Sequence, residues 1–249
     1  MSVDYSSIAD DVFVNLNLQT ALPLPDNRET VLNFYEAVQK QFRSMTMLYQ
    51  RESGEYVLEG DRESGRYQWM EIQSNRLAAG AFNPDDLESA FRFHRWLLQR
   101  SVYYLGVGGL DVECIDLMFG FNLDYVGNRD AIVSQALLEG SPLAAMSGEI
   151  GADCVEFEPN IVFALEQDCY RQVRLSIETR GSSFQIRTGQ YEPEPISVYL
   201  TVREHPRPGE VLDFNAAFAQ HCQVLEELTS SVVIPNVLQP IASAISTAQ

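Results

Sequence analysis

Residues 11–126 alternate between strand-like and helix-like patterns in one order: strand, helix, strand, strand, helix, strand. Apolar and polar residues alternate from Val12 to Leu18, as they do in a half-buried strand. Two later stretches, residues 31–45 and 87–98, place apolar residues at helical spacing. We therefore expect a compact α+β unit over this part of the chain.

Both predicted helices have recognisable start signals. Asp26 is followed three residues later by Glu29, which is the spacing of a capping box. The segment Asn83–Asp86 combines a cap, a proline at the first helical position and acidic residues in the first turn. The remaining elements are expected to be strands, at residues 46–59, 66–82 and 112–125.

This order of elements resembles a ferredoxin-like α/β sandwich, here over residues 1–127. The resemblance concerns the pattern of elements and no particular family. It implies a fold class but no activity, because this fold carries many unrelated functions.

The second half, residues 128–249, has a different pattern. A short helix is expected from Asn128 to Leu138, and the small, Gly-rich residues 141–153 are the best candidate for a linker or mobile loop. A four-strand antiparallel meander and a helix from Glu210 to about Ser230 follow; the strands are expected at residues 155–166, 170–180, 183–190 and 196–204. We expect this half to pack with residues 1–127 as one globular body.

The last residues, from Leu228 to Gln249, contain no charged side chain. Val237, Ile241 and Ile245 recur every four residues. Two interpretations are open: a final helix packed on the chain's own core, or an amphipathic arm that docks on a second subunit or a partner.

Composition restricts the partners and the compartment. The 249 residues carry a formal net charge of −18, which repels nucleic acids and anionic membranes, so neither is expected as a partner. We see no uninterrupted apolar run long enough to cross a membrane, and the N-terminus lacks signal-peptide features. The four cysteines show no paired spacing, so we expect a cytoplasmic protein with reduced thiols.

Familiar catalytic motifs are missing from the sequence. It has no Gly-Lys-Ser/Thr phosphate loop, no His-Glu-x-x-His and no Gly-x-Ser-x-Gly. We therefore expect no cofactor and no metal, and we favour a protein that is not an enzyme.

Polar residues gather where the predicted strand 112–125 meets the following helix. Asp124, Asn128 and Asp130 are expected to offer oxygen donors there to a cation or a hydroxylated ligand. The alternative makes Asn128 a helix cap and Asp130 a first-turn partner of the helix dipole. His94 is the other candidate ligand-binding residue, with burial in the core or at its rim as the alternative.

Three arginines in the predicted meander, Arg174, Arg187 and Arg203, are expected to share one sheet face. Such a face suits an acidic peptide or a small anion. It is also typical of the solvated side of an antiparallel sheet.

Three hypotheses about function remain open. The first is a binding or adaptor module, chaperone-like and self-associating or bound to a protein partner, that uses a sheet face or the C-terminal arm. The second is a sensor or enzyme that holds a small molecule at the junction of the two halves. The third is a structural subunit of an assembly.

Overall fold

The computed structural model describes residues 5–52, 54–151 and 154–248, which form one mixed α+β body around a nine-stranded antiparallel sheet. The strand order is β2-β3-β4-β5-β1-β6-β9-β8-β7. The strands are β1 Asp11–Thr20, β2 Met45–Gln50, β3 Tyr56–Gly60, β4 Tyr67–Gln73, β5 Arg76–Phe82, β6 Val112–Asp124, β7 Asn160–Ala164, β8 Arg171–Glu178 and β9 Pro195–Glu204.

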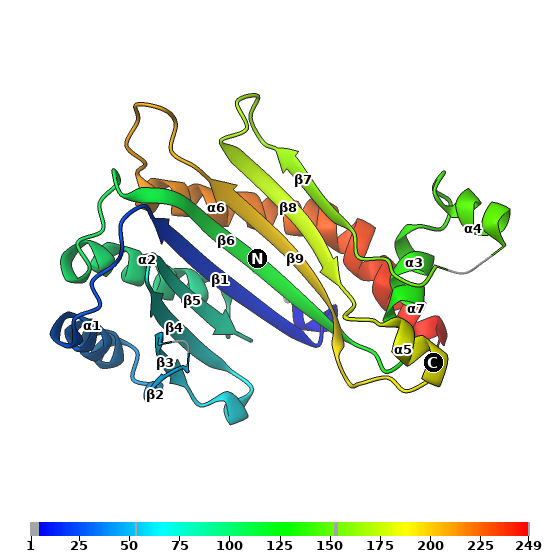
Figure 1. The fold of residues 1–249 in the computed structure, drawn as a ribbon, viewed down its shortest axis with the longest axis horizontal. Helices are drawn as coiled ribbons and strands as arrows, with labels where there is room; N and C mark the ends of the chain where they lie inside the picture. Colours follow the sequence, from blue (N-terminus) through cyan, green and yellow to red (C-terminus); the bar gives the residue numbers. More distant parts are fainter. Residues whose placement is uncertain (1–4, 53, 152–153, 249) are drawn as a thin grey trace.

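The helices lie behind this sheet or at its ends (Figure 1). They are α1 Arg28–Gln41, α2 Leu87–Tyr104, α3 Arg129–Leu137, α4 Ala144–Ile150, α5 Ser183–Thr188, α6 Phe214–Leu228 and α7 Gln239–Ala248, with short 3₁₀ turns at Tyr5–Ser7 and Arg62–Ser64.

The two halves of the sequence share the sheet. β6, from the first half, pairs along its length with β9, from the second, with Gly120 opposite Tyr199. The same strand pairs on its other side with β1. The predicted division near residue 127 therefore falls within one continuous sheet. That residues 1–127 and 128–249 are separate folding units stays a prediction.

The main core lies on one side of the sheet only. Val14, Leu16 and Leu18 of β1 are fully buried and belong to the cluster that packs against the helices. The intervening residues of β1 are half-buried and point to the other side, which no helix of the described chain covers (Figure 1). This alternation follows from the two-residue period of a strand.

The C-terminal segment packs on the chain's own core. α6, a π-helical stretch Thr229–Leu238 and α7 run on as one helix, with Pro235 inside the π-helical stretch. By length and composition alone, this helix could cross a membrane, but a helix packed on the core of a soluble protein passes the same test. Its residues Leu225, Leu238 and Ile241 are fully buried against the protein.

Two predicted strands are hairpins. Residues 46–59 form β2 and β3, and residues 66–82 form β4 and β5. Turn residues interrupt each predicted strand, although the apolar pattern runs through them. Gly54 has a φ of 103°, and the Ser74-Asn75 pair separates β4 from β5. The first half therefore contributes six strands, and the ferredoxin-like layout itself is not confirmed.

The predicted four-strand meander has three strands. Residues 183–190 were expected to be a strand, but Ser183–Thr188 form α5 because the Ser182 hydroxyl caps the helix and Gly189, at a φ of 66°, ends it. The predicted linker 141–153 contains α4, and its residues 152 and 153 lie outside the described chain.

Candidate functional site

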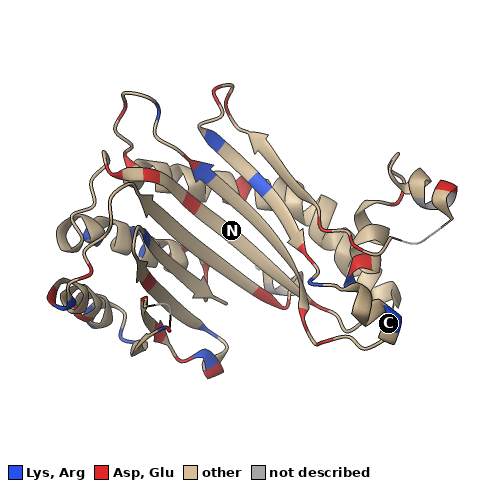
Figure 2. Ribbon diagram, viewed as in Figure 1, with Lys and Arg blue, Asp and Glu red and all other residues tan. Residues whose placement is uncertain are grey.

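The helix-free side of the sheet, which we call the open face, presents half-buried aromatic side chains together with arginines. It consists of alternate residues from the paired strands, because neighbouring strands in register point the same residues to one side. Its centre is formed by Tyr67 and Trp69 of β4, Phe82 of β5, Phe13 and Asn15 of β1, Met118 of β6, Tyr199 and Thr201 of β9, and Arg174 of β8. Figure 2 shows basic residues on β8 and a long uncharged stretch along β1.

Four aromatic rings form a continuous band across this face. Tyr67 stacks on Phe82 with ring centroids 5.2 Å apart, and Phe82 stacks on Phe13 at 6.1 Å. Phe13 then meets Tyr199 edge to face at 6.0 Å. All four side chains are half-buried, so the band is ordered by its own contacts while one side remains exposed.

Two strand glycines leave room for aromatic side chains on the open face, one for Phe13 of the band and one for the neighbouring Trp69. A Cβ at Gly120 would come within 2.1 Å of the Phe13 ring. A Cβ at Gly80 would come within 2.3 Å of the Trp69 indole nitrogen. The sequence signal for the band is therefore an aromatic residue placed opposite a strand glycine, which becomes visible only when the register is known.

An arginine lies at each end of the aromatic band. The Arg62 guanidinium is 5.7 Å from the Tyr67 ring centroid, a cation–π distance. At the other end Arg180 donates to the Tyr199 hydroxyl and to Ser197 Oγ, both at 2.9 Å. The band thus offers flat apolar surface between two cationic groups.

A small depression of about 130 Å³ lies beside the band. Arg174, Arg203 and Gln172 line it, so two of the three predicted arginines do share this face. Arg203 is bound by both carboxylate oxygens of Asp116, at 2.7 and 2.6 Å, which raises the pKa of its guanidinium. Arg187 lies instead on α5, because its segment is a helix.

At the predicted polar junction, Asn128 and Asp130 make hydrogen bonds within the fold, and ligand binding there stays a prediction. Asn128 caps α3 by accepting from Ala131 N, and Asp130 is buried, accepting from Phe157 N and from Thr179 Oγ1. Asp124 is exposed, and partial desolvation of its carboxylate, with lesser effects of the nearby Asp10 and Asp11, raises its pKa. Asn128 also lines a depression of about 600 Å³ beside α3, but Asp124 and Asp130 do not.

Sequence reasoning missed Arg129, the residue that holds this junction together. Its side chain is 1 % exposed and donates to the carbonyl oxygens of Thr179 at 2.5 Å and Glu192 at 2.9 Å. It also donates to those of Glu194 and Arg180 at 3.3 and 3.4 Å. Its four acceptors are main-chain groups at least fifty residues away in the sequence, so no local motif reveals them.

The other predicted site residues are buried. His94 is fully buried near the Phe93 and Phe218 rings, and burial lowers its pKa to about 3. Val237, Ile241 and Ile245 are at most 9 % exposed and belong to the main core cluster. The structure therefore places the tail on the chain's own core, and these residues are not free to dock on a partner.

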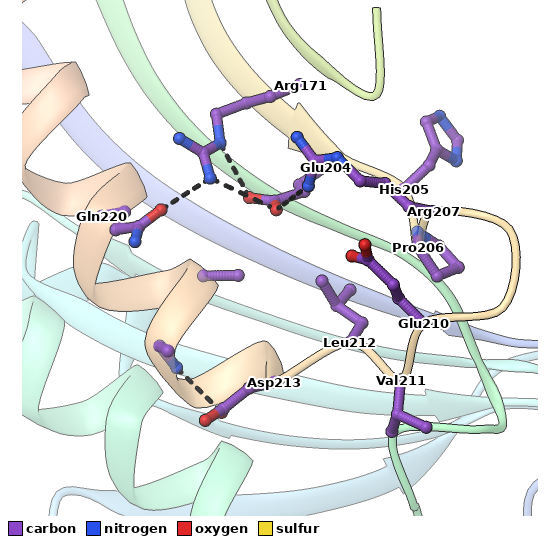
Figure 3. Close-up of a pocket in the computed structure, with 12 residues that line it drawn as sticks. Arg171, Glu204, His205, Pro206, Arg207, Glu210, Val211, Leu212, Asp213 and Gln220 are labelled. Carbon is purple, nitrogen blue, oxygen red and sulfur yellow. Dashed lines mark hydrogen bonds and ion pairs between the residues drawn. The ribbon is translucent and has the colours of Figure 1, made fainter. Parts of the chain in front are cut away.

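A second polar site lies where β9 meets α6, around a cavity of about 200 Å³ (Figure 3). Buried Glu204 accepts from Arg171 at 2.9 and 3.3 Å, and its Oε2 lies 3.3 Å from His221 Nε2. Arg171 also donates to Gln220 of α6 at 2.6 Å. These contacts join β8 and β9 to the long helix.

The arginines of this second site are already paired with carboxylates. His221 and Arg171 hold the pKa of Glu204 at about 2. Arg207 pairs with Asp168 at 2.9 Å and with Glu166, so both arginines already have carboxylate partners. The cluster is thus typical of a structural clamp, since no cation remains for an anionic ligand.

Replacing Glu204 with glutamine should lower the free energy of unfolding by about 3 kcal/mol at pH 7, because it leaves Arg171 without its buried counter-charge. The stabilisation is present above pH 4.5 and is lost as the pH falls toward 2, the lowered pKa. The free energies of unfolding of wild type and variant, measured with urea, should therefore become equal as the pH approaches that acidic end. Glu113→Gln, on an exposed residue of β6, is the control, and equal unfolding midpoints for both variants would contradict the clamp.

Within the described ranges, no group of three or more His, Cys, Asp or Glu side chains is placed to hold a metal ion. Comparison with known proteins adds no assignment. The chain matches no family model, and no curated protein is significantly similar to it.

Proposed function

We propose that the chain is a chaperone-like binding or adaptor module that acts through protein–protein contacts made by the open face. The observation that carries this proposal is the aromatic band, which consists of four rings in contact on a face that no described helix covers. Tyr, Trp, Phe, Met and Arg are the residues enriched in protein interfaces, and the open face presents all five types.

The physical properties of the open face favour a polypeptide over a small anion. The depression beside the band is small, about 130 Å³, and the Arg203 guanidinium in it is already bound to Asp116. A partner segment can instead lay apolar side chains along the exposed side of the rings, where stacked aromatics contribute most. The formal net charge of −18 favours a neutral or basic partner.

A cytoplasmic location belongs to the same proposal. The four cysteines are free thiols, and Cys114 and Cys222 are buried in the fold. Free thiols are typical of a reducing compartment.

The test compares two tagged variants in extracts of cells that naturally express the chain. Tyr67→Ser/Tyr199→Ser removes the two outer rings of the band, and Tyr103→Ser removes a ring that is 81 % exposed on α2. We expect quantitative mass spectrometry to show at least a tenfold loss of specifically co-purified proteins for the band variant, with wild-type recovery for Tyr103→Ser. Equal recovery by all three proteins, or no specific partner for wild type, would reject the proposal.

A further inference from the structure

The outer strand β7 is an exposed apolar edge. Its sequence, Asn-Ile-Val-Phe-Ala, is uncharged, and Ile161, Val162 and Phe163 are 46, 47 and 54 % exposed. β7 pairs with β8 on one side, and no other strand of the described chain lies on the other (Figure 1). Figure 2 shows the whole strand free of charge.

The backbone of β7 points unpaired hydrogen-bonding groups away from the sheet. Leu165 N donates to Arg171 O, and Ile177 N donates to Pro159 O. The main-chain N–H and C=O groups of the odd-numbered residues in this stretch are therefore directed toward β8. In an antiparallel ladder the alternate residues face the other way. The N–H and C=O groups of Asn160, Val162 and Ala164 are therefore directed to the free edge.

β7 is short, with 5 residues, but it lacks charged residues, bulges and internal prolines, three features that block many edge strands. The opposite edge, β2, has a register shift between Met45 and Met47. β7 pairs with β8 without interruption from Asn160 to Ala164. Pro159 precedes the strand and directs its carbonyl to β8, so it leaves the outer edge open.

Carboxylates lie at both ends of this apolar edge. Glu156 and Glu158 precede β7, and Glu166 and Asp168 follow it. Arg171 and Arg207 balance the second pair only in part, because they also contact Glu204. An added strand with Lys or Arg at its ends would meet favourable charge at both positions.

The same charges disfavour a second copy of this chain. Antiparallel pairing of β7 with itself about Val162 would bring Glu158 opposite Glu166 of the other copy. Sliding the register by two residues brings Glu156 opposite Glu166, or Glu158 opposite Asp168. Like charges directly opposite each other destabilise a strand pair, so every such register is penalised.

We propose that β7 binds an extended segment of a partner protein as a tenth strand of the sheet, with an alternating apolar core and basic residues at both ends. The apolar side chains of the bound segment lie beside Ile161 and Phe163 on the helix side of the sheet. The main-chain groups that the segment directs toward β7 pair with those of Asn160, Val162 and Ala164. This edge is a surface separate from the aromatic band, so the two proposals can fail independently.

The experiment measures binding of a fluorescein-labelled peptide, Lys-Lys-Val-Thr-Val-Thr-Val-Lys-Lys, to the full chain by fluorescence anisotropy. Val162→Pro removes an outward N–H without breaking a bond to β8, and Val162→Thr keeps both the backbone donor and the β-branched shape. We expect Val162→Pro to weaken binding at least tenfold and Val162→Thr less than twofold. Exchanging the peptide lysines for glutamates should also weaken binding at least tenfold at low salt.

Hydrogen exchange of the wild-type chain gives a readout that does not depend on a folded proline variant. The amides of Asn160, Val162 and Ala164 should become protected on peptide addition, while those of Ile161 and Phe163 are protected already. Equal binding by wild type and a folded Val162→Pro variant would overturn the proposal, as would no added protection at the three amides. A wild-type dimer that Val162→Pro dissociates would overturn it in favour of a second copy, and the Tyr67→Ser/Tyr199→Ser variant should still bind the peptide.

Discussion

Replacing Arg129 with methionine is expected to lower the free energy of unfolding by about 3–5 kcal/mol, the largest effect of any substitution proposed for this chain, because several buried carbonyl oxygens lose their donor at once. Methionine keeps an unbranched, largely apolar stem but removes the guanidinium and with it every donor. The carbonyl oxygens of Thr179, Glu192 and Glu194 would then lose a buried partner at a site that is 1 % exposed. Urea denaturation followed by circular dichroism measures this loss.

Arg187→Met is the matched control for this prediction. Arg187 lies in the same region, on α5, but is exposed, so the same change of chemistry should shift the free energy of unfolding by less than about 0.5 kcal/mol. Comparable losses for the two variants would show that charge, and not the buried hydrogen bonds of Arg129, stabilises the junction.

The junction also shows what the sequence can and cannot predict. The cap at Asn128 was predicted and is confirmed, because capping depends on neighbours within one helical turn. The burial of Asp130 depends on Thr179, and Gly181 is required there because a Cβ would come within 1.8 Å of the Asp130 carboxylate. Contacts between such distant residues follow from the strand order, which periodicity does not specify.

The fold has the same division between local and distant information. The predicted α+β class holds, and strand β1 and helix α2 fall where alternation and helical spacing placed them. The two hairpins and α5 were missed because short turn and cap signals were averaged into longer patterns. The aromatic band could not be predicted, because it needs the register that places Phe13 opposite both Phe82 and Gly120.

Replacing His94 with leucine is expected to make the protein less sensitive to acid. Burial lowers the pKa of His94 from 6.5 to about 3, so the unfolded chain binds a proton that the folded chain does not between these values. The free energy of unfolding of wild type is not reduced by the titration of His94 above pH 6.5, and it falls by about 1.4 kcal/mol per pH unit below that value as the unfolded chain takes up the proton. The variant does not lose stability in this way. At pH 7 its free energy of unfolding should be about 1–2 kcal/mol higher than that of wild type, because neither ring nitrogen of His94 has a hydrogen-bond partner among the described residues.

Urea unfolding at pH 7 and pH 5 separates this effect from the acid response of Glu204, whose stabilisation is lost only below pH 4.5. Between the two conditions wild type should lose about 2 kcal/mol more than His94→Leu. His205→Gln, which changes a half-buried histidine bonded to a main-chain carbonyl in a loop, should keep the wild-type acid dependence. If His94→Leu also keeps it, the proton taken up on acid unfolding belongs to another group, and the buried ring of α2 is not the source of acid sensitivity.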